Sequence, residues 1–392
     1  MKKYDFENII DRRNTGSEKW NIAFEKVRDI PEGIVPLSVA DMEFPLPPPI
    51  KEGLKNWLEN CVLGYTDATD EYYDEVIRWM ERRHSFSPKK EWFILTPGVV
   101  SALFDMVRAF TKEGDHVIIN TPVYYPFRMA VRQTGRVLVE SHLIPDGNTY
   151  KFDFDDFERK CSDERAKLFI LCSPHNPSGR VWTKDELLTI SEICLKHNVF
   201  IISDEIHFDL ILPGYRHTSL ATFEGKYLQN CAICTSPSKT FNLAGLQCSN
   251  IFIPDEGKRN LLKKQKGFFT LNAFAYPVTI FAYRDCEDWL NELIGLIDNN
   301  KKLVESFFKI NIPLAKIYDL QGTYLQWIDF KFLGMDNREL GKFMNEKAYI
   351  FASEGYAFGS GGEGFERFNL ACPTRVIDEA LIRLNKAISE KI

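Results

Sequence analysis

The chain has 392 residues, enough for two domains, and its 44% hydrophobic and 27% charged residues are typical of a folded globular protein. Its formal net charge of −6 argues against a surface for nucleic acid or anionic membranes, which would need a basic excess. The longest uncharged run, residues 268–283, is shorter than the ~18–20 residues of a membrane span. We interpret it as core or interface.

The N-terminal residues and the cysteines indicate that the protein works in a reducing compartment. The first ten residues, MKKYDFENII, lack the apolar stretch of a signal peptide. Together with nine cysteines this predicts a reducing, cytoplasmic location. Cys231 and Cys234 form a CxxC inside the apolar run CAIC, which is typical of a strand. Because residues three apart on a strand face opposite sides, we expect buried thiols and no metal site.

Strand and helix patterns then alternate along the chain. The segment PLPPP (45–49) is expected to be extended and to cross between domains. Buried strands are predicted at His116–Asn120, at Lys167–Cys172 and in VFIIS (199–203). A capping box, Thr183-Lys-Asp-Glu186, opens a helix that runs through His197. Continuous apolar strands alternating with helices predict an α/β fold with a parallel sheet covered on both faces.

The pattern changes after residue 286. A long helix (Trp289–Phe308) is followed by the alternating run TYLQWIDF (323–330), as in a smaller α+β domain. We therefore predict a large domain at 51–286 and a small discontinuous domain formed by 1–50 and 287–392. Residues 359–364 fit the pattern GxGxxG, but they precede a strand-like run rather than a helix, so we reject a dinucleotide site there.

Three predicted strands end in polar residues. KLFILC leads to Asn176, FIIS leads to Asp204, and CAICT leads to Lys239. In a parallel sheet, ligands bind beyond the carboxyl ends of the strands. We therefore expect these three side chains to converge on one crevice.

The three residue types point to pyridoxal-phosphate chemistry. A confined lysine of lowered pKa is a natural Schiff-base former. An aspartate beside the pyridine nitrogen keeps that nitrogen protonated, which makes the ring an electron sink. Asn176 could bond the ring's 3-oxygen, and Tyr124 or Tyr125 could stack on the ring. Any one of these residues alone is more often a surface charge, a turn former or part of the core.

A phosphate could be held nearby. Ser236 and Ser238 offer small hydroxyls beside Lys239. The turn formed by Gly98, Val99 and Val100 opens a predicted helix (101–110), whose free N–H groups suit an anion.

At these residues the chain resembles fold-type I pyridoxal-phosphate enzymes of the class I/II aminotransferase superfamily. Within them it is similar to the C–S lyase branch of cystathionine β-lyase and cystalysin type. The resemblance spans essentially the full length. It rests on HNPSG (175–179), SPSKTFNLAG (236–245), VADMEF (39–44), LGYT (63–66), PVYYP (122–126), SDEIHFDL (203–210), GTYLQW (322–327) and GFERFNLA (364–371).

The resemblance implies a large domain with a mixed, mainly parallel sheet, a smaller α+β domain, and a pyridoxal 5'-phosphate cofactor. It implies that Lys239 bonds the cofactor and that Arg367 clamps the substrate α-carboxylate. Tyr65 matches a tyrosine that reaches the phosphate of a neighbouring subunit, which implies a homodimer with shared sites. The implied catalytic residues are Lys239, Tyr124, Tyr125 and Asp204; the implied cofactor ligands are Lys239, Asp204, Asn176, Tyr124, Gly98, Val99, Val100, Ser236, Ser238 and Tyr65; the implied substrate ligands are Arg367, Asn176 and Tyr125.

The implied reaction is α,β-elimination of an S-substituted amino acid to pyruvate, ammonia and a thiol. Gln247 stands eight residues after the lysine, where many aminotransferases of this fold have an arginine, and this favours the lyase branch. An aminotransferase is the alternative, and a regulatory protein on the same scaffold is a third possibility. The thiol half of the substrate is left open, since it depends on a pocket shaped by Phe44, Tyr125 and residues 359–364.

Overall fold

The computed structural model describes residues 4–267 and 269–391. Residue 268 of the predicted core run and the first three residues of the N-terminal segment lie outside the described residues. Residues 275–283 of that run confirm the interpretation as core, because nearly all of them are buried in α11 (Ala275–Asp285), which packs against α2 (Pro48–Leu58) and α3 (Asp70–His84). Of residues 269–274 only Leu271 is buried, so for them the interpretation stays a prediction. Within the described ranges, no helix combines the length and the apolar character needed to span a bilayer.

The larger sheet has seven strands in the order β1-β9-β8-β7-β6-β2-β3. Strands β3, β2, β6, β7 and β8 pair in parallel, whereas β9 is antiparallel to both β8 and β1. The predicted mixed, mainly parallel sheet is thus confirmed. The strands are β1 (Phe93–Thr96), β2 (His116–Thr121), β3 (Val137–His142), β6 (Ala166–Cys172), β7 (Phe200–Asp204), β8 (Cys231–Thr235) and β9 (Ser249–Phe252).

Helices cover both faces of this sheet. In β6, Leu168 and Ile170 belong to one core cluster and Phe169 and Leu171 to the other, as expected of a strand buried on both sides. The predicted capping box is present at the start of α7. The helices are α3, α4 (Val99–Phe110), α5 (Pro126–Arg132), α6 (Phe154–Cys161), α7 (Lys184–Lys196), α8 (Lys226–Gln229), α9 (Pro237–Thr240), α10 (Glu256–Gln265) and α11.

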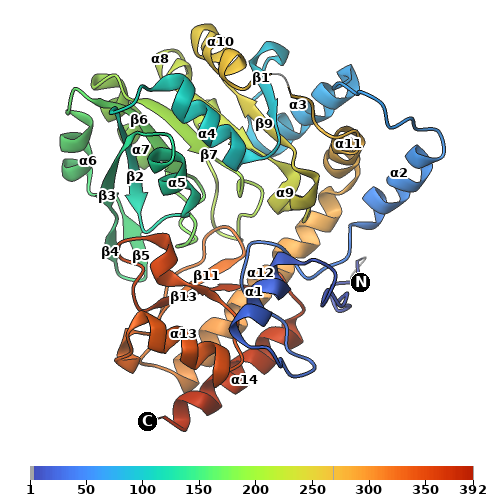
Figure 1. The fold of residues 1–392 in the computed structure, drawn as a ribbon, viewed down its shortest axis with the longest axis vertical. Helices are drawn as coiled ribbons and strands as arrows, with labels where there is room; N and C mark the ends of the chain where they lie inside the picture. The colour runs from blue at the N-terminus through green and yellow to red at the C-terminus, as the bar shows by residue number, and fades with distance from the viewer. Residues whose placement is uncertain (1–3, 268, 392) are drawn as a thin grey trace.

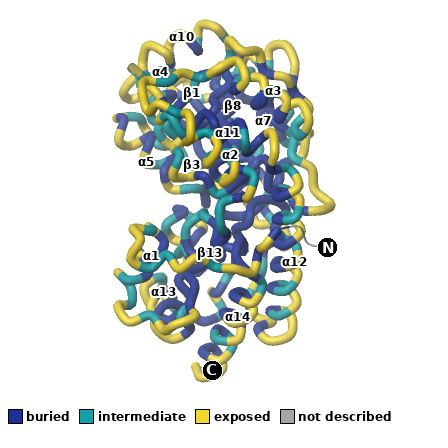
Figure 2. Tube along the Cα trace, turned by 90° about the vertical axis from the view of Figure 1, so that its right-hand side faces the viewer, coloured by how far each residue is buried: buried dark blue, intermediate teal, exposed yellow. Residues whose placement is uncertain are grey.

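A second, antiparallel sheet lies below the first in Figure 1, beside long C-terminal helices. Figure 2 shows buried residues inside both parts and exposed residues on the outer helices and loops. The sheet has the order β10-β11-β13-β12. Its elements are α12 (Glu287–Asn311), β10 (Lys316–Ile317), β11 (Leu325–Asp329), α13 (Asn337–Glu346), β12 (Ser353–Glu354), β13 (Phe365–Asn369) and α14 (Thr374–Ser389), with the hairpin β4 (Ile144–Asp146) and β5 (Thr149–Lys151) above it.

The N-terminal segment, which includes α1 (Glu18–Lys26), is bonded to the second sheet. Leu37 N donates to Phe351 O, and Asn369 N donates to Leu37 O, both at 2.9 Å. Lys26 pairs with Glu354 of β12 at 2.6 Å. These contacts are compatible with a small discontinuous domain, whose boundaries at residues 50 and 286 stay a prediction.

Two local predictions were wrong. Pro48 and Pro49 are helical rather than extended, because they form the first turn of α2, where proline needs no N–H donor. The alternation expected in TYLQWIDF is also absent, since four of the five residues of β11 are buried. The strand is covered on more than one side, and Trp327 Nε1 donates to Tyr150 Oη of the β4–β5 hairpin at 3.4 Å.

The CAIC run is strand β8 and is fully buried, as predicted. All nine cysteines are free thiols, and eight of them are buried.

Candidate functional site

Asn176, Asp204 and Lys239 lie at or just after the ends of three adjacent strands, β6, β7 and β8, at the same edge of the large sheet. Ser173 N donates to Asp204 O and Glu205 N donates to Cys234 O, both at 2.9 Å, so backbone bonds hold the three strand ends in register. The expected convergence is therefore present.

The turn that carries Asn176 requires a glycine at Gly179. This residue has φ +71°, and a Cβ there would lie 2.6 Å from Leu320 Cδ1 and 3.3 Å from Gly322 O. His175 N donates to Arg180 O and Gly179 N to His175 O, both at 2.8 Å. The turn thus packs closely on the segment before β11 and fixes Asn176, which is buried.

Lys239 lies in α9, a single helical turn that begins with Pro237 after the N-cap Ser236. Its Nζ donates to the carbonyl oxygen of Ala40 at 2.8 Å. Burial lowers the pKa of Lys239 to about 8, against the opposing attraction of Asp41. A lysine of this pKa is unprotonated far more often near neutral pH than a surface lysine, as nucleophilic attack on a carbonyl requires.

Asp204 is the last residue of β7 and is buried. Its Oδ1 accepts from Ile206 N at 3.1 Å. Burial raises the pKa of Asp204 to about 7, although the bond from Ile206 and the nearby Lys239 both act to lower it. A cationic N–H placed beside this carboxyl would restore its charge, which is the pairing expected of a pyridine nitrogen.

Arg367 comes from β13 of the second sheet and is 5% exposed. Its Nη1 donates to Asn176 Oδ1 at 2.7 Å and its Nη2 to Ser353 Oγ at 3.0 Å, while its buried Nε has no partner. Burial lowers the pKa of Arg367 to about 10. Among the described residues no carboxylate pairs with it, and such a buried cation is suited to an anionic ligand.

Tyr124 and Tyr125 lie beside the strand-end residues. Tyr124 N donates to Asn176 O at 3.1 Å, and the two tyrosine rings are 5.4 Å apart. Burial raises the pKa of Tyr124, and Tyr125 and Asp204 raise it further. Tyr124 therefore keeps its proton at neutral pH. Tyr125 is 44% exposed and leads into α5.

The predicted phosphate ligands sit at two turns. Gly98 has φ +101° at the N-cap of α4, and a Cβ there would meet nothing within 4 Å, so the N–H groups of Val99 and Val100 begin a twelve-residue helix beside open space. Ser236 Oγ lies 2.6 Å from Cys248 O, to which it donates, and 2.7 Å from Ser238 Oγ. Ser236 Oγ also accepts from Ser238 N at 3.1 Å and so caps α9.

Tyr65 and Gln247 lie apart from this cluster. Tyr65 is fully exposed, and within the described ranges no hydrogen bond or ion pair joins it to another predicted site residue. Gln247 is exposed and ends a short 3₁₀ turn with φ +50°. Neither contributes to the site within a single chain.

The structure adds residues that the sequence analysis missed. Tyr324 Oη donates to Ala40 O at 2.9 Å, beside the bond from Lys239. His207 is buried, its Nδ1 has no partner, and Lys239 and Arg367 add to the burial that lowers its pKa. Ala40 acts through its backbone carbonyl, which its residue type does not signal. Tyr324 lies in the motif GTYLQW and His207 in SDEIHFDL, so both residues could have been identified from the motifs that carry the family resemblance.

Together, these groups can hold an anionic ring compound and an amino acid side by side. Lys239 offers a nucleophilic amine, Asp204 a carboxyl for a ring nitrogen, and Arg367 a cation for a carboxylate. The amide NH₂ of Asn176 stays available, because its oxygen accepts from Arg367.

Comparisons with known proteins agree with this geometry. The family described as aminotransferase class I and II matches residues 33–384. The chain is 40% identical to cystathionine beta-lyase PatB of Bacillus subtilis, over 98% of this chain and 100% of that protein. These matches confirm the resemblance inferred from the motifs.

Solved structures are similar over nearly the whole chain. Cystalysin of Treponema denticola, whose crystal structure contains a pyridoxal 5'-phosphate cofactor, has 46% identity and a TM-score of 0.97, with 99% of both chains covered. A pyridoxal-phosphate-bound C–S lyase of Staphylococcus hominis has 32% identity and a TM-score of 0.91, with 98% of both chains covered.

Proposed function

The chain belongs to the aminotransferase class I and II family, and we propose that it is a pyridoxal-phosphate-dependent C–S β-lyase. It would cleave cystathionine or cysteine-type S-substituted amino acids to pyruvate, ammonia and a thiol. The observation that carries the proposal is that Lys239 and Asp204, at one edge of the large sheet, meet Arg367 from the small sheet. Asp204 and Arg367 are buried, Lys239 is half-buried, and the pKa of each is shifted. The names of its relatives, among them PatB and cystalysin, support this specificity.

The residues present fit the cofactor. Asp204 is a buried carboxyl with one hydrogen bond, which leaves acceptor capacity for a ring N–H. The open space at Gly98 leaves room for a phosphate at the start of α4. Tyr124 would stack on the ring, Asn176 would bond its 3-oxygen, and Ser238 would assist Gly98, Val99, Val100 and Ser236 at the phosphate.

When bound, pyridoxal phosphate supplies an aldehyde carbon for an amine and a ring that takes up electrons released at the substrate Cα. Arg367 and Asn176 hold the substrate carboxylate, which fixes the direction of the Cα–H bond. Lys239 Nζ, with its lowered pKa, then removes the Cα proton as general base. In this structure the amine donates to Ala40 O, which also accepts from Tyr324 Oη.

The next step breaks the Cβ–S bond, and the departing sulfur takes a proton. Tyr124 holds its proton at neutral pH and is placed beside the site, so it is the proposed donor, with Tyr125 or protonated Lys239 as the other candidates. Water then hydrolyses the remaining three-carbon fragment to pyruvate and ammonia.

The working enzyme is proposed to be a cytoplasmic homodimer with shared sites. Tyr65 is fully exposed, and its neighbours Val62 and Leu63 are 85% and 63% exposed. Such an apolar segment is suited to burial by a second copy, whose cofactor phosphate Tyr65 would reach. Tyr65→Phe should weaken cofactor affinity and leave the dimer intact in analytical ultracentrifugation.

A paired assay tests the function. The purified holoprotein is incubated with cystathionine, and separately with alanine and a keto acid. We expect pyruvate and thiol in equal amounts from the first mixture and little amino exchange in the second. Amino exchange without thiol release would instead identify an aminotransferase.

A further inference from the structure

Asp209 lies five residues after Asp204 and has a fully buried side chain. Its Oδ1 accepts from Trp79 Nε1 at 3.1 Å and lies 2.7 Å from His84 Nε2. Burial lowers the pKa of His84, so a neutral ring with its proton on Nε2 donates to the carboxylate. Arg83 Nε adds positive charge at 3.8 Å. This carboxylate is therefore well satisfied, although it is not one of the groups in the proposed reaction.

The fourth partner of Asp209 is the residue next to Lys239. Thr240 is fully buried, and its Oγ1 donates to Asp209 Oδ2 at 2.7 Å. Because α9 has only four residues, it lacks the series of backbone bonds that stiffens a longer helix. A side-chain bond at its last residue thus limits how the turn, and Lys239 on it, can move.

The same carboxylate belongs to the segment that carries Asp204. Phe208 N donates to Glu205 O and Leu210 N to His207 O, both at 2.9 Å, so residues 205–210 form a compact turn directly after Asp204. The Asp209–Thr240 bond therefore ties the segment of Asp204 directly to the turn of Lys239.

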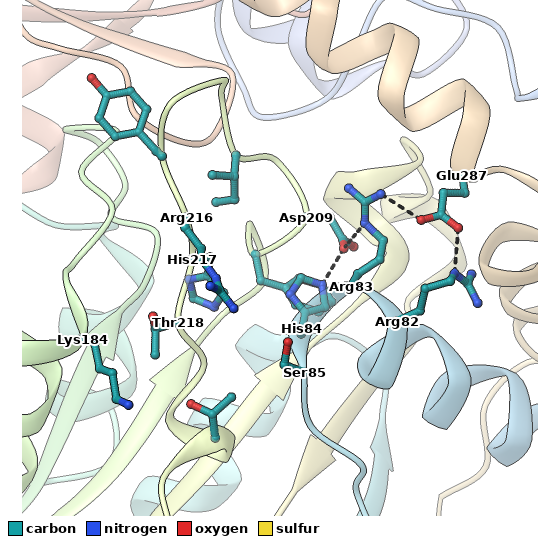
Figure 3. Close-up of a pocket in the computed structure, with 14 residues that line it drawn as sticks. Arg82, Arg83, His84, Ser85, Lys184, Asp209, Arg216, His217, Thr218 and Glu287 are labelled. Atoms are coloured by element: carbon teal, nitrogen blue, oxygen red, sulfur yellow. Dashed lines mark hydrogen bonds and ion pairs between the residues drawn. The ribbon is translucent and has the colours of Figure 1, made fainter.

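Charged residues anchor Asp209 from the outer side. Figure 3 shows His84, Asp209, Arg83, Glu287 and Arg82 joined one after another along the wall of a cavity of about 660 Å³. Arg83 Nη1 meets Glu287 Oε1 at 3.1 Å, and Glu287 Oε2 meets Arg82 Nε at 2.7 Å. Arg82, Arg83 and His84 belong to α3 and Glu287 opens α12, so the network links these two helices to Asp209.

We propose that Asp209 and Thr240 are positioning residues: their hydrogen bond sets the location of Lys239 relative to Asp204 and so the rate of proton transfer at the substrate Cα. This inference rests on the proposed function, and it adds residues that touch neither substrate nor cofactor. A loss of position of ~1 Å at a catalytic group can lower a rate by about 10²-fold.

The test compares Thr240→Val with Thr240→Ser in the holoenzyme. Valine keeps the shape and removes the donor to Asp209, whereas serine keeps the hydroxyl. We expect Thr240→Val to lower kcat by about 10-fold with KM for cystathionine within a factor of ~2, because Arg367 still binds the carboxylate. The visible circular dichroism of the bound cofactor should change in amplitude. Thr240→Ser should restore both.

Thr279→Val is the matched control. Thr279 is also fully buried and bonds a carbonyl of its own helix, Ala275 O, at 2.7 Å. We expect this variant to keep kcat and the circular dichroism signal. A Thr240→Val protein with wild-type values, or equal changes in both valine variants, would overturn the inference. The dichroism is read without turnover, so it tests the inference even where the lyase assay fails.

Discussion

The large sheet and the small sheet contribute to the site in different ways. In the large sheet, the reactive groups stand at or just after the ends of parallel strands: Asp204 ends β7, and Lys239 follows β8 by four residues. In the small sheet, Arg367 lies within β13, and its side chain reaches Asn176 in the turn that follows β6 of the large sheet. From this difference we infer that the large sheet supports the cofactor chemistry, whereas the small sheet recognises the substrate carboxylate.

Replacing Lys239 should abolish the cofactor chemistry that the large sheet supports. We expect Lys239→Ala to lose covalent attachment of the cofactor and to lower kcat by about 10³-fold or more, since no general base remains at the Cα proton. The measurement is turnover of cystathionine together with the mass of the denatured protein after borohydride reduction. A variant that kept the added cofactor mass would contradict the role of Lys239.

Replacing Asp204 should slow the chemistry while the cofactor stays attached. Asp204→Asn has the same shape but cannot carry the negative charge that stabilises a protonated ring nitrogen. We expect kcat to fall by about 10²-fold, with cofactor content close to one per chain by absorbance after alkaline release. A wild-type kcat would show that the carboxyl is not used in the reaction.

Replacing Arg367 should act mainly on substrate binding. Charged hydrogen bonds contribute about 1.5–3 kcal/mol, so Arg367→Gln should raise KM for cystathionine by about 10- to 100-fold. Cofactor content and the visible spectrum should stay unchanged. Arg338→Gln, an exposed arginine of α13, serves as control and should keep the wild-type KM. A loss of cofactor in Arg367→Gln would contradict the inference that the small sheet serves substrate binding alone.

The smallest effect concerns stability without cofactor. Burial raises the pKa of Asp204 from 3.8 to about 7, so between these values the folded chain holds a proton that the unfolded chain has released. Stability contributed by this group therefore falls as the pH rises through that window. We expect cofactor-free Asp204→Asn to melt higher than cofactor-free wild type at pH 8, with a smaller difference at pH 5.

Thermal unfolding at the two pH values checks this, with the exposed Asp378→Asn as control. A difference between Asp204→Asn and wild type that is the same at both pH values would mean that Asp204 does not titrate as its burial indicates.

The sequence was most informative where a polar residue of specific chemistry follows an apolar strand. Lys239, Asp204 and Asn176 each follow an apolar run, and parallel pairing of β6, β7 and β8 brings those runs together. The α/β fold followed from the alternation of apolar strands and helices, and the family followed from the motifs; both are confirmed. The catalytic and ligand roles of individual residues stay predictions.

Other parts of the site depend on contacts that a sequence pattern does not encode. Ala40 contributes a carbonyl oxygen, which any residue type has. The bond from Thr240 to Asp209 joins residues 31 positions apart, so neither residue signals the other. Pro48 and Pro49 are compatible with both an extended segment and a first helical turn, and packing of α2 against α11 accompanies the helix.

The central claim is that the cofactor bonds to the lysine that follows β8. The most direct test is to reduce the purified holoprotein with borohydride, digest it, and locate the added pyridoxyl mass by peptide sequencing in the mass spectrometer. We predict the mass on Lys239 alone. A label on another lysine, or no label in a protein that carries the cofactor, would contradict this account.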